Sequence, residues 1–354
     1  MTTPALHTAL PRVTRHWYIA CTGRDLGETP LRRFLFGTPL VLFRNAMGRA
    51  VAFLDRCPHR NVPLSQGKVI AGRLSCFYHG WSFASDGTCC DIPALGGAPS
   101  GKAHRAVVFP AREHDGYVWV YGEPAATPTT NPFRFALLGD RRYGLYRYAG
   151  AFRGTLLNTL ENILDVPHTA FLHGGLFRTR RRLRRVRCVV KRTHGCVEAT
   201  YLDEPVPGGA LGRLLVPGGG TVAHVDRFLV PGIAQVEYRL GDRGHLLITN
   251  ALTPARDFVT QLHTLVALRL PRVPGWAAAS ILATLLRPLV RRIVHQDETA
   301  LRLQSEAIAR FGGERFASSG ADVLGPHILR LLRCAERDEV GGGEDIAEQL
   351  TLWL

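Results

Sequence analysis

Four residues that can ligate a metal stand in two short pairs. Cys57 and His59 form a C-x-H pair, and Cys76 and His79 form a C-x-x-H pair. Thiolates and imidazoles are both metal ligands, and two short loops that face each other can bring the four side chains together. The sixteen residues from 60 to 75 are enough for the chain to leave the first pair and return with the second. The pattern therefore predicts a metal centre.

The mixed composition of the pairs favours an iron–sulfur cluster over zinc. In a Rieske [2Fe–2S] centre two histidines replace two cysteines on one iron, so each loop supplies one Cys and one His. A structural Cys₂His₂ zinc site is the alternative, but zinc pairs usually read C-x-x-C and H-x₃₋₅-H, with the two residue types segregated. Gly72 and Gly80 suit tight backbone beside a cluster, and Trp81 can shield it from water.

A second group of metal-ligating residues follows in the segment ENILDVPHTAFLH. Two histidines and a distant carboxylate make the facial triad of a non-haem Fe(II) oxygenase. His168 and His173 are five residues apart, which is about 140° of rotation on an ideal helix. A helix predicted over 156–172 must therefore end or distort between them, and Gly174 and Gly175 supply a terminator. Ordinary histidines at a helix end are the alternative interpretation.

The third ligand must be a carboxylate, and a helical wheel from Leu285 to Ile308 ranks the candidates. Asp297 lies in the middle of one apolar face, Glu298 lies at its edge, and Glu306 lies nearly opposite. The apolar residues of this face are Leu286, Val290, Ile293, Val294, Leu301 and Ile308. An unpaired carboxylate on a buried face is costly, so Asp297 needs a cation or strong donors. An exposed or helix-capping Asp297 is the alternative.

The two motifs together resemble those of a known family. CPHR…CFYHGW resembles the cluster-binding motif of the Rieske non-haem iron oxygenases, of the aromatic-ring-hydroxylating alpha-subunit type. The spacing N-x-x-D-x-x-H-x-x-x-x-H, from Asn162 to His173, resembles the family's catalytic iron motif, and the resemblance also points to Asp297. Respiratory-type Rieske proteins carry an extra cysteine in each loop. Here Arg60-Asn61 and Phe77-Tyr78 occupy that neighbourhood, which favours the oxygenase type.

The resemblance assigns a role to Asp165 as well. In the family the matching aspartate bridges the cluster of one subunit to the catalytic iron of its neighbour. Asp165 would then hydrogen-bond His168 and a cluster histidine, His79, of an adjacent chain, as a residue that carries electron transfer without ligating iron. The resemblance therefore implies a homotrimer.

The pattern of segments predicts two domains. Short β-branched and aromatic runs bounded by turn residues predict an all-β domain over residues 12–124, and a Pro-, Thr- and Ala-rich linker covers 123–133. Beyond it, a helix, strand-like runs between 186 and 266 and a helical region over 276–311 predict an α+β domain with helices on one antiparallel sheet, residues 125–354. By resemblance, this catalytic domain has the helix-grip (START/Bet v1-like) fold.

Charge and hydropathy bear on partners and location. The net charge of +15 comes almost wholly from arginine, and the run RTRRRLRRVRCVVKR, residues 178–192, is the densest part. A solvated face, a docking patch for an acidic electron donor and an anionic membrane surface are its three interpretations. Nucleic acid is not expected, because no aromatic residues are interleaved with the arginines.

The apolar stretch WAAASILATLL, 276–286, falls short of the ~20 residues of a spanning helix. It predicts either core packing or the wall of an apolar substrate tunnel, and it leaves room for peripheral membrane contact. The N-terminus lacks the long apolar run of a signal peptide, so we expect a cytoplasmic protein with reduced thiols.

The predicted function is that of an oxygenase component. The resemblance implies a [2Fe–2S] cluster and a mononuclear Fe(II), O₂ as oxidant, and electrons from NAD(P)H delivered by a separate reductase or ferredoxin. We expect hydroxylation or oxidative demethylation of a hydrophobic aromatic, terpenoid or sterol-like ring, with cis-dihydroxylation of an aromatic ring as the alternative. A pure Rieske electron carrier, which needs only about 120 residues, and a zinc-stabilised binding module are the alternatives from other classes.

Overall fold

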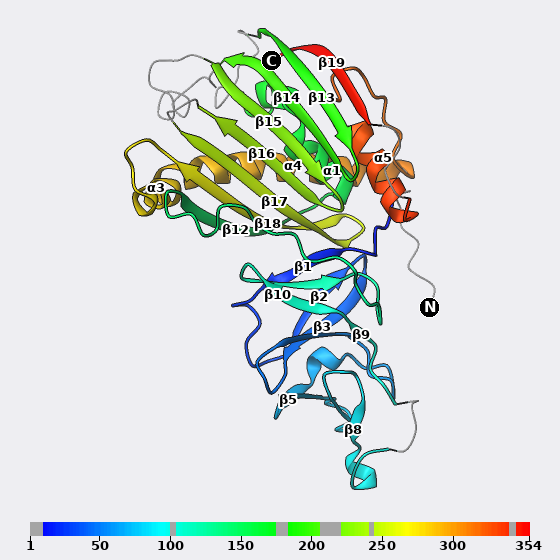
Figure 1. The fold of residues 1–354 in the computed structure, drawn as a ribbon. Coiled ribbons are helices and arrows are strands. Elements are labelled where there is room, and N and C mark those ends of the chain that lie inside the picture. The colour runs from blue at the N-terminus through cyan, green and yellow to red at the C-terminus, as the bar shows by residue number, and fades with distance from the viewer. Residues whose placement is uncertain (1–9, 100–103, 175–182, 206–220, 241–243, 340–344) are drawn as a thin grey trace. The chain divides into compact units, whose positions relative to one another are not determined.

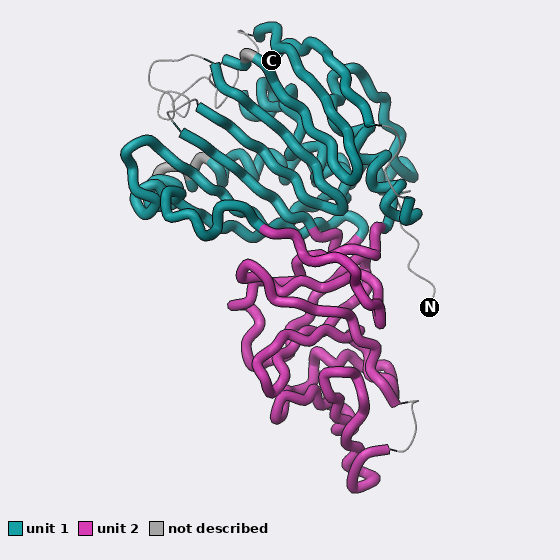
Figure 2. Tube along the Cα trace, viewed as in Figure 1, with its two compact units in different colours: residues 1–12, 135–252, 257–354 teal, residues 13–134, 253–256 magenta. Residues whose placement is uncertain are grey.

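The computed structural model of the chain describes residues 10–99, 104–174, 183–205, 221–240, 244–339 and 345–354. It divides into two compact units (Figure 2). The smaller unit consists of Val13–Arg134 and Thr253–Arg256, and the larger consists of Met1–Arg12, Phe135–Leu252 and Asp257–Leu354. Each unit has its own sheets and is described by itself.

The smaller unit is built from three antiparallel sheets (Figure 1). Their strand orders are β1-β11-β10, β2-β3-β4-β9 and β5-β6-β7-β8. The strands are β1 (Trp17–Thr22), β2 (Leu31–Leu35), β3 (Thr38–Arg44), β4 (Ala50–Leu54), β5 (Lys68–Ile70), β6 (Arg73–Ser75), β7 (Ser82–Phe83), β8 (Cys89–Asp91), β9 (Val108–Phe109), β10 (Ala111–His114) and β11 (Tyr117–Tyr121), with 3₁₀ turns at Leu64–Gln66 and Pro93–Leu95.

Two hydrophobic clusters hold the smaller unit together. One surrounds Phe43, Phe53 and Phe83, and it includes Cys57 and Cys76 among its buried members. The other packs β1 and β11 against the second sheet around Leu42 and Val118. Because the cysteine-bearing loops belong to the first cluster, burial of apolar side chains also positions the two thiols.

The larger unit is one eight-stranded antiparallel sheet with the order β12-β18-β17-β16-β15-β14-β13-β19 (Figure 1). The strands are β12 (Gly144–Phe152), β13 (Arg185–Thr193), β14 (Cys196–Pro205), β15 (Thr221–Leu229), β16 (Ile233–Arg239), β17 (His245–Arg256), β18 (Val259–Arg269) and β19 (Ile346–Trp353). Helices gather on one face of this sheet, which agrees with the predicted α+β class.

Among its described residues, the larger unit has the helices α1 (Leu156–Leu164), α3 (Gly275–Ile281), α4 (Arg287–Phe311) and α5 (Gly325–Glu336). A 3₁₀ turn, η3 (Pro167–Ala170), follows α1, and a π-helical turn (Leu282–Leu286) joins α3 to α4. Among the described residues, no helix combines the length and the apolar character needed to cross a bilayer.

Helix α1 is shorter than the sequence pattern predicts. The Thr155 side chain accepts a hydrogen bond from the N–H of Asn158 and caps its start, but the helix ends at Leu164 and not at Leu172. Asp165 is extended, and Pro167 has no N–H with which to continue the helical hydrogen bonds. The expected break between His168 and His173 therefore falls before both histidines.

The described half of the basic run, residues 183–192, is largely strand β13. Its side chains alternate, so that Arg185, Arg187 and Lys191 are exposed while Val186 and Val190 are buried. Strand alternation explains this pattern of charged and apolar residues and is compatible with each of the three interpretations of the run. Residues 178–182 of the run lie outside the described residues.

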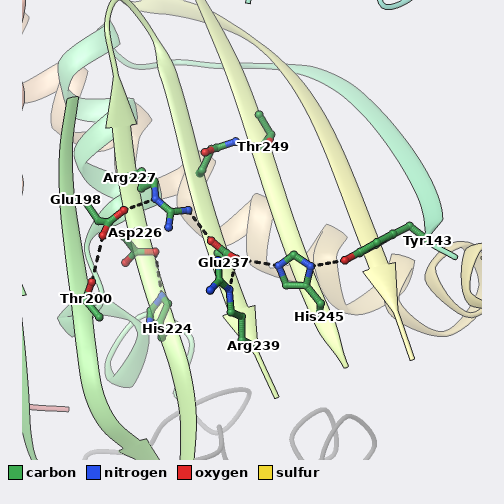
Figure 3. A network of polar contacts seen from close by, with 11 residues as sticks. Tyr143, Glu198, Thr200, His224, Asp226, Arg227, Glu237, Arg239, His245 and Thr249 are labelled. Carbon is green, nitrogen blue, oxygen red and sulfur yellow. Dashed lines mark hydrogen bonds and ion pairs between the residues drawn. The ribbon is translucent and has the colours of Figure 1, made fainter. Parts of the chain in front are cut away.

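Charged side chains cross-link the middle strands of the large sheet (Figure 3). Arg227 of β15 pairs with Glu198 of β14 and, at 2.5 Å, with Glu237 of β16. Glu237 also pairs with Arg239 at 2.6 Å and with His245 at 2.9 Å. Burial raises the pKa of Glu237, but Arg227 and Arg239, together with the hydrogen bond to His245, outweigh it and lower that pKa to about 2. The network links four neighbouring strands, β14 to β17, and so supports their register.

Candidate metal centres

The two cysteine loops of the smaller unit are built alike. In each, a backbone N–H donates back to the cysteine carbonyl four residues earlier, from Asn61 to Cys57 at 2.9 Å and from Gly80 to Cys76 at 3.0 Å. Both closing residues have positive φ, +61° for Asn61 and +73° for Gly80. Asparagine and glycine adopt this conformation most easily, so the local sequences CPHRN and CFYHG form matching turns.

Neighbouring side chains hold these loops in place. The first loop follows β4 directly, and buried Asp55 at its start accepts hydrogen bonds from the N–H and hydroxyl of Ser65, each at 2.7 Å. The second loop joins β6 to β7. Gly72 lies in the turn before it with φ of +72°, as the tight-backbone prediction expects.

The four predicted cluster ligands separate into a thiol pair and an imidazole pair. Cys57 and Cys76 are buried, and burial, with the neighbouring Cys76 thiol adding to it, raises the pKa of Cys57 to about 11. The rings of His59 and His79 lie 4.5 Å apart between centroids, and His79 is exposed. Trp81 is buried and stacks on His59 with ring centroids 4.5 Å apart, a position from which it could shield a cluster at these loops.

This arrangement fits a two-iron cluster. A [2Fe–2S] centre of the Rieske type takes two thiolates at one iron and two imidazoles at the other. The side chains are already sorted in that way, with sulfur inside the hydrophobic cluster and nitrogen toward the surface. With a cluster held there, the exposed His79 would give electrons a short route into and out of the protein.

The second candidate centre lies in the larger unit, between the segment after α1 and the middle of α4. His168 belongs to the 3₁₀ turn η3, His173 follows it, and Asp297 comes from α4. Their three ligand atoms lie within 4.8 Å of one another. The Nε2 atoms of His168 and His173 are 3.2 Å apart, and Asp297 Oδ1 lies 3.1 Å from His173 Nε2 and 3.7 Å from His168 Nε2.

Each histidine is anchored through its other ring nitrogen. His168 Nδ1 lies 3.2 Å from Asp165 Oδ2, and His173 Nδ1 lies 2.9 Å from Gln296 Oε1. Both oxygens are acceptors, so each imidazole donates from Nδ1 and directs Nε2 toward Asp297. Burial opposes a charge on His173, but the hydrogen bonds to Asp297 and Gln296 outweigh it and raise its pKa.

The donor set fits a mononuclear metal. Two imidazoles and one carboxylate converge from one side, which is the arrangement that leaves coordination positions open on non-haem Fe(II). The Asp297 side chain is 13% exposed, and Asn162 Nδ2 donates to its Oδ1 at 3.2 Å. The sequence predicts that this carboxylate needs a cation or strong donors. In the structure two imidazoles and one amide group surround it.

The carboxylate that the helical wheel ranks first, Asp297, is the one that lies beside the two histidines, but the wheel does not place every neighbour. Glu306 forms an exposed ion pair with Arg302, and Glu298 does not join the group. Val290, expected on the buried face, is 38% exposed, because the first turns of α4 have solvent on several sides. In the apolar stretch before it, Ala278 and Leu282 are buried, whereas Trp276 is exposed.

Sequence reasoning missed the role of Gln296. Nothing in the spacing of HQDE distinguishes its amide from any other polar side chain on α4. The position of Gln296 directly before Asp297 could have suggested the role, since a polar residue beside a metal ligand often orients a second ligand.

Two loops that sort thiols from imidazoles, together with a His–His–Asp group, are the arrangement expected of the class of iron proteins that have a Rieske cluster and a mononuclear iron. Comparisons with known proteins identify the family. Residues 16–102 match the Rieske [2Fe-2S] domain, and residues 152–337, more than half of the chain, match the vanillate O-demethylase oxygenase C-terminal domain. The chain belongs to the Rieske non-haem iron oxygenases, in the group with this C-terminal domain.

Individual relatives cover part of the chain. Dicamba O-demethylase, oxygenase component, of Stenotrophomonas maltophilia is 36% identical over 166 residues, which is 46% of this chain and 48% of the relative. The 4beta-methylsterol monooxygenase of Methylococcus capsulatus is 34% identical over 163 residues, 45% of this chain and 44% of the relative. The chain thus matches about half the length of these curated relatives.

A solved structure extends the likeness in fold. Dicamba monooxygenase bound to 3,6-dichlorosalicylic acid superposes with a TM-score of 0.77, at 24% identity, over 93% of this chain and 99% of that one. At this identity the likeness concerns the fold, and it agrees with the predicted β domain followed by an α+β domain.

Proposed function

We propose that this protein is the oxygenase component of a system that hydroxylates or oxidatively demethylates a hydrophobic ring compound. The observation that carries the proposal is the convergence of His168, His173 and Asp297 in a chain that also sorts Cys57 and Cys76 from two histidines. The oxidant is O₂, and a reductase or ferredoxin supplies electrons that originate in NAD(P)H. The relatives named above support an aromatic or sterol-like substrate.

We assign the site residues as follows. Cys57, Cys76, His59 and His79 hold the [2Fe–2S] cluster, within a Rieske domain of residues 12–124. His168, His173 and Asp297 hold the mononuclear iron, within a catalytic domain of residues 125–354. When bound, the cluster supplies single electrons and the iron supplies an open position for O₂.

The chain's own groups then have distinct tasks. Asp165 and Gln296 keep the Nδ1 protons of the two histidines in place, so both Nε2 atoms stay available as ligands. Asn162 holds the Asp297 carboxylate and limits its rotation. Asp165 is 37% exposed, so it can also accept a hydrogen bond from His79 of the partner subunit in a homotrimer.

Metal analysis and one substitution test the proposal. The purified chain should contain three irons and two acid-labile sulfides, which excludes a structural zinc site. Asp297→Ala should keep the visible spectrum of the cluster and two of the three irons, while product formation is lost. Glu306→Gln, on the same helix but away from the centre, is the matched control and should keep all three irons. Full activity of Asp297→Ala would show that another group is the third ligand.

The product distinguishes the proposed reaction from its alternative. A monohydroxylated or demethylated ring supports the proposal, and a cis-diol supports ring dihydroxylation. A chain that accepts electrons from a reductase but oxidises no ring compound would instead act as an electron carrier.

A further inference from the structure

Two cavities of the larger unit meet at one carboxyl group. An outer groove of about 1110 Å³ is lined by α5 and by the turn after α4, and an inner chamber of about 260 Å³ is lined by α1, β14 and α4. The inner chamber reaches the ligand His168. Glu161 and Gly325 line both cavities. A Cβ at Gly325 would lie 2.4 Å from Glu161 Oε1, so this glycine leaves room for the carboxyl group at the boundary.

The inner chamber presents buried polar atoms that have no hydrogen-bond partner among the described residues. These are the amide oxygen and nitrogen of Asn158 and the hydroxyl of Tyr201. Asn158 is 2% exposed and Tyr201 is 1% exposed. Buried polar groups are nearly always hydrogen-bonded, to ordered water where no protein group is near. A chamber of this size holds several water molecules, each of which occupies about 30 Å³ in the liquid.

The surroundings of Glu161 favour its protonated form. Burial raises its pKa to about 7, and the negative charges of Asp322, Glu314 and Asp165 contribute. Asp322 lines the inner chamber before α5, and Glu314 lines the outer groove after α4. The outer groove is also lined by four cationic side chains and one further acidic one. The cations are Arg315, Arg330, Arg333 and Arg337, and the acid is Glu339. On the inner side, α4 contributes the neutral Gln304 and the sheet contributes Tyr201.

We propose that Glu161 relays protons from the outer groove, through water in the inner chamber, to the reaction beside His168. The proposal deepens the proposed function and rests on it, because monooxygenation consumes protons. The balance is R–H + O₂ + 2 e⁻ + 2 H⁺ → R–OH + H₂O, with the electrons supplied by the reductase. Glu161 gives its O–H proton to a chamber water as a proton is taken up at the centre. Its carboxylate is then reprotonated from the groove.

Three variants test the relay in the complete enzyme. Glu161→Gln should lower the rate of product formation by about tenfold or more and raise the NAD(P)H consumed per product, because the amide cannot exchange a proton. Glu161→Asp keeps a carboxyl group and should restore part of the rate. In the wild type the rate should fall as pH rises through about 7, when the proton donor is depleted.

Asp322→Asn provides a readout that a purely structural role would not give. Removal of this negative charge should lower the pKa of Glu161, so the fall in rate should move to lower pH while the maximum rate is kept. Glu306→Gln lines neither cavity and should leave the pH profile unchanged.

An infrared titration tests Glu161 without turnover. The full chain as purified, compared with Glu161→Gln, should show a carboxylic C=O band that disappears with a midpoint near pH 7. The absence of such a band would overturn the relay. An unchanged rate and pH profile in Glu161→Gln would also overturn it. A change in KM alone would do the same, because it would mean that the chamber holds a polar group of the substrate. Loss of iron from both Glu161 variants would likewise contradict the relay. A wild type that oxidises no substrate contradicts the proposed function, whereas an active wild type with any of these outcomes contradicts the relay alone.

Discussion

Replacement of His224 by glutamine should destabilise the larger unit by about 3–5 kcal/mol at pH 6.5, because it leaves two buried carboxylates without their cation. His224 lies on β15 and is 1% exposed. Its Nδ1 is 2.6 Å from Glu204 and its Nε2 is 2.9 Å from Asp226, so both ring nitrogens donate and the imidazole is charged. The rings of Tyr201 and Tyr238 stack on its two faces, with centroids 4.7 Å and 4.2 Å away.

The same contacts predict a pH dependence of stability. Burial lowers the pKa of His224, but Asp226 and Glu204 outweigh it and raise that pKa from 6.5 to about 9. Each unit of pKa corresponds to about 1.4 kcal/mol, so the change corresponds to about 3 kcal/mol of folding free energy. Because the folded value is raised, this stabilisation is fully present below pH 6.5 and is lost as pH rises through about 9.

Urea unfolding followed by circular dichroism, at pH 6.5 and at pH 9.5, measures both effects. The wild type should lose about 3 kcal/mol more than His224→Gln between these pH values, since only the wild type has this proton to lose. His194→Gln, in the exposed turn between β13 and β14, is the control and should behave as the wild type. Equal pH dependence in the wild type and His224→Gln would refute a charged, carboxylate-paired His224.

Two further substitutions test the turns and the bridge. Gly72→Ala should destabilise the smaller unit by about 1–3 kcal/mol and lower its cluster content, because φ is +72° and the new Cβ would lie 2.0 Å from the nitrogen of Ala46. Thermal melts measure this loss of stability. Gly48→Ala, with similar φ but open space around the new Cβ, is the control and should destabilise the unit less. Asp165→Asn should keep both metal centres but slow electron transfer between them, as stopped-flow reoxidation of the reduced cluster would show, and wild-type rates would argue against the bridge.

Much of the site could be predicted because metal ligation constrains residue type and spacing together. Cys57, His59, Cys76 and His79 form mixed pairs that few other functions require. Asp297 was identifiable for a physical reason, since a carboxylate amid an apolar helical stripe has to be compensated.

Other features depend on tertiary structure and leave no periodic signal. The end of α1 at Leu164 reflects the extended Asp165 and the proline that follows, which override an apolar pattern running on to Leu172. Helix α5 and strand β19 were not predicted, although α5 packs on α1 and β19 pairs with β13. The position of Glu161 between two cavities depends on Gly325, more than 160 residues later in the chain.

The central claim is that one chain stores electrons at its cysteine–histidine loops and uses them at the His168–His173–Asp297 centre. Rapid mixing of the reduced protein with an oxidisable ring substrate and O₂ tests it most directly. The account predicts that the wild type regains the visible spectrum of the oxidised cluster as product forms, and that Asp297→Ala stays reduced over the same time. Reoxidation of Asp297→Ala at the wild-type rate, with product, would contradict the account.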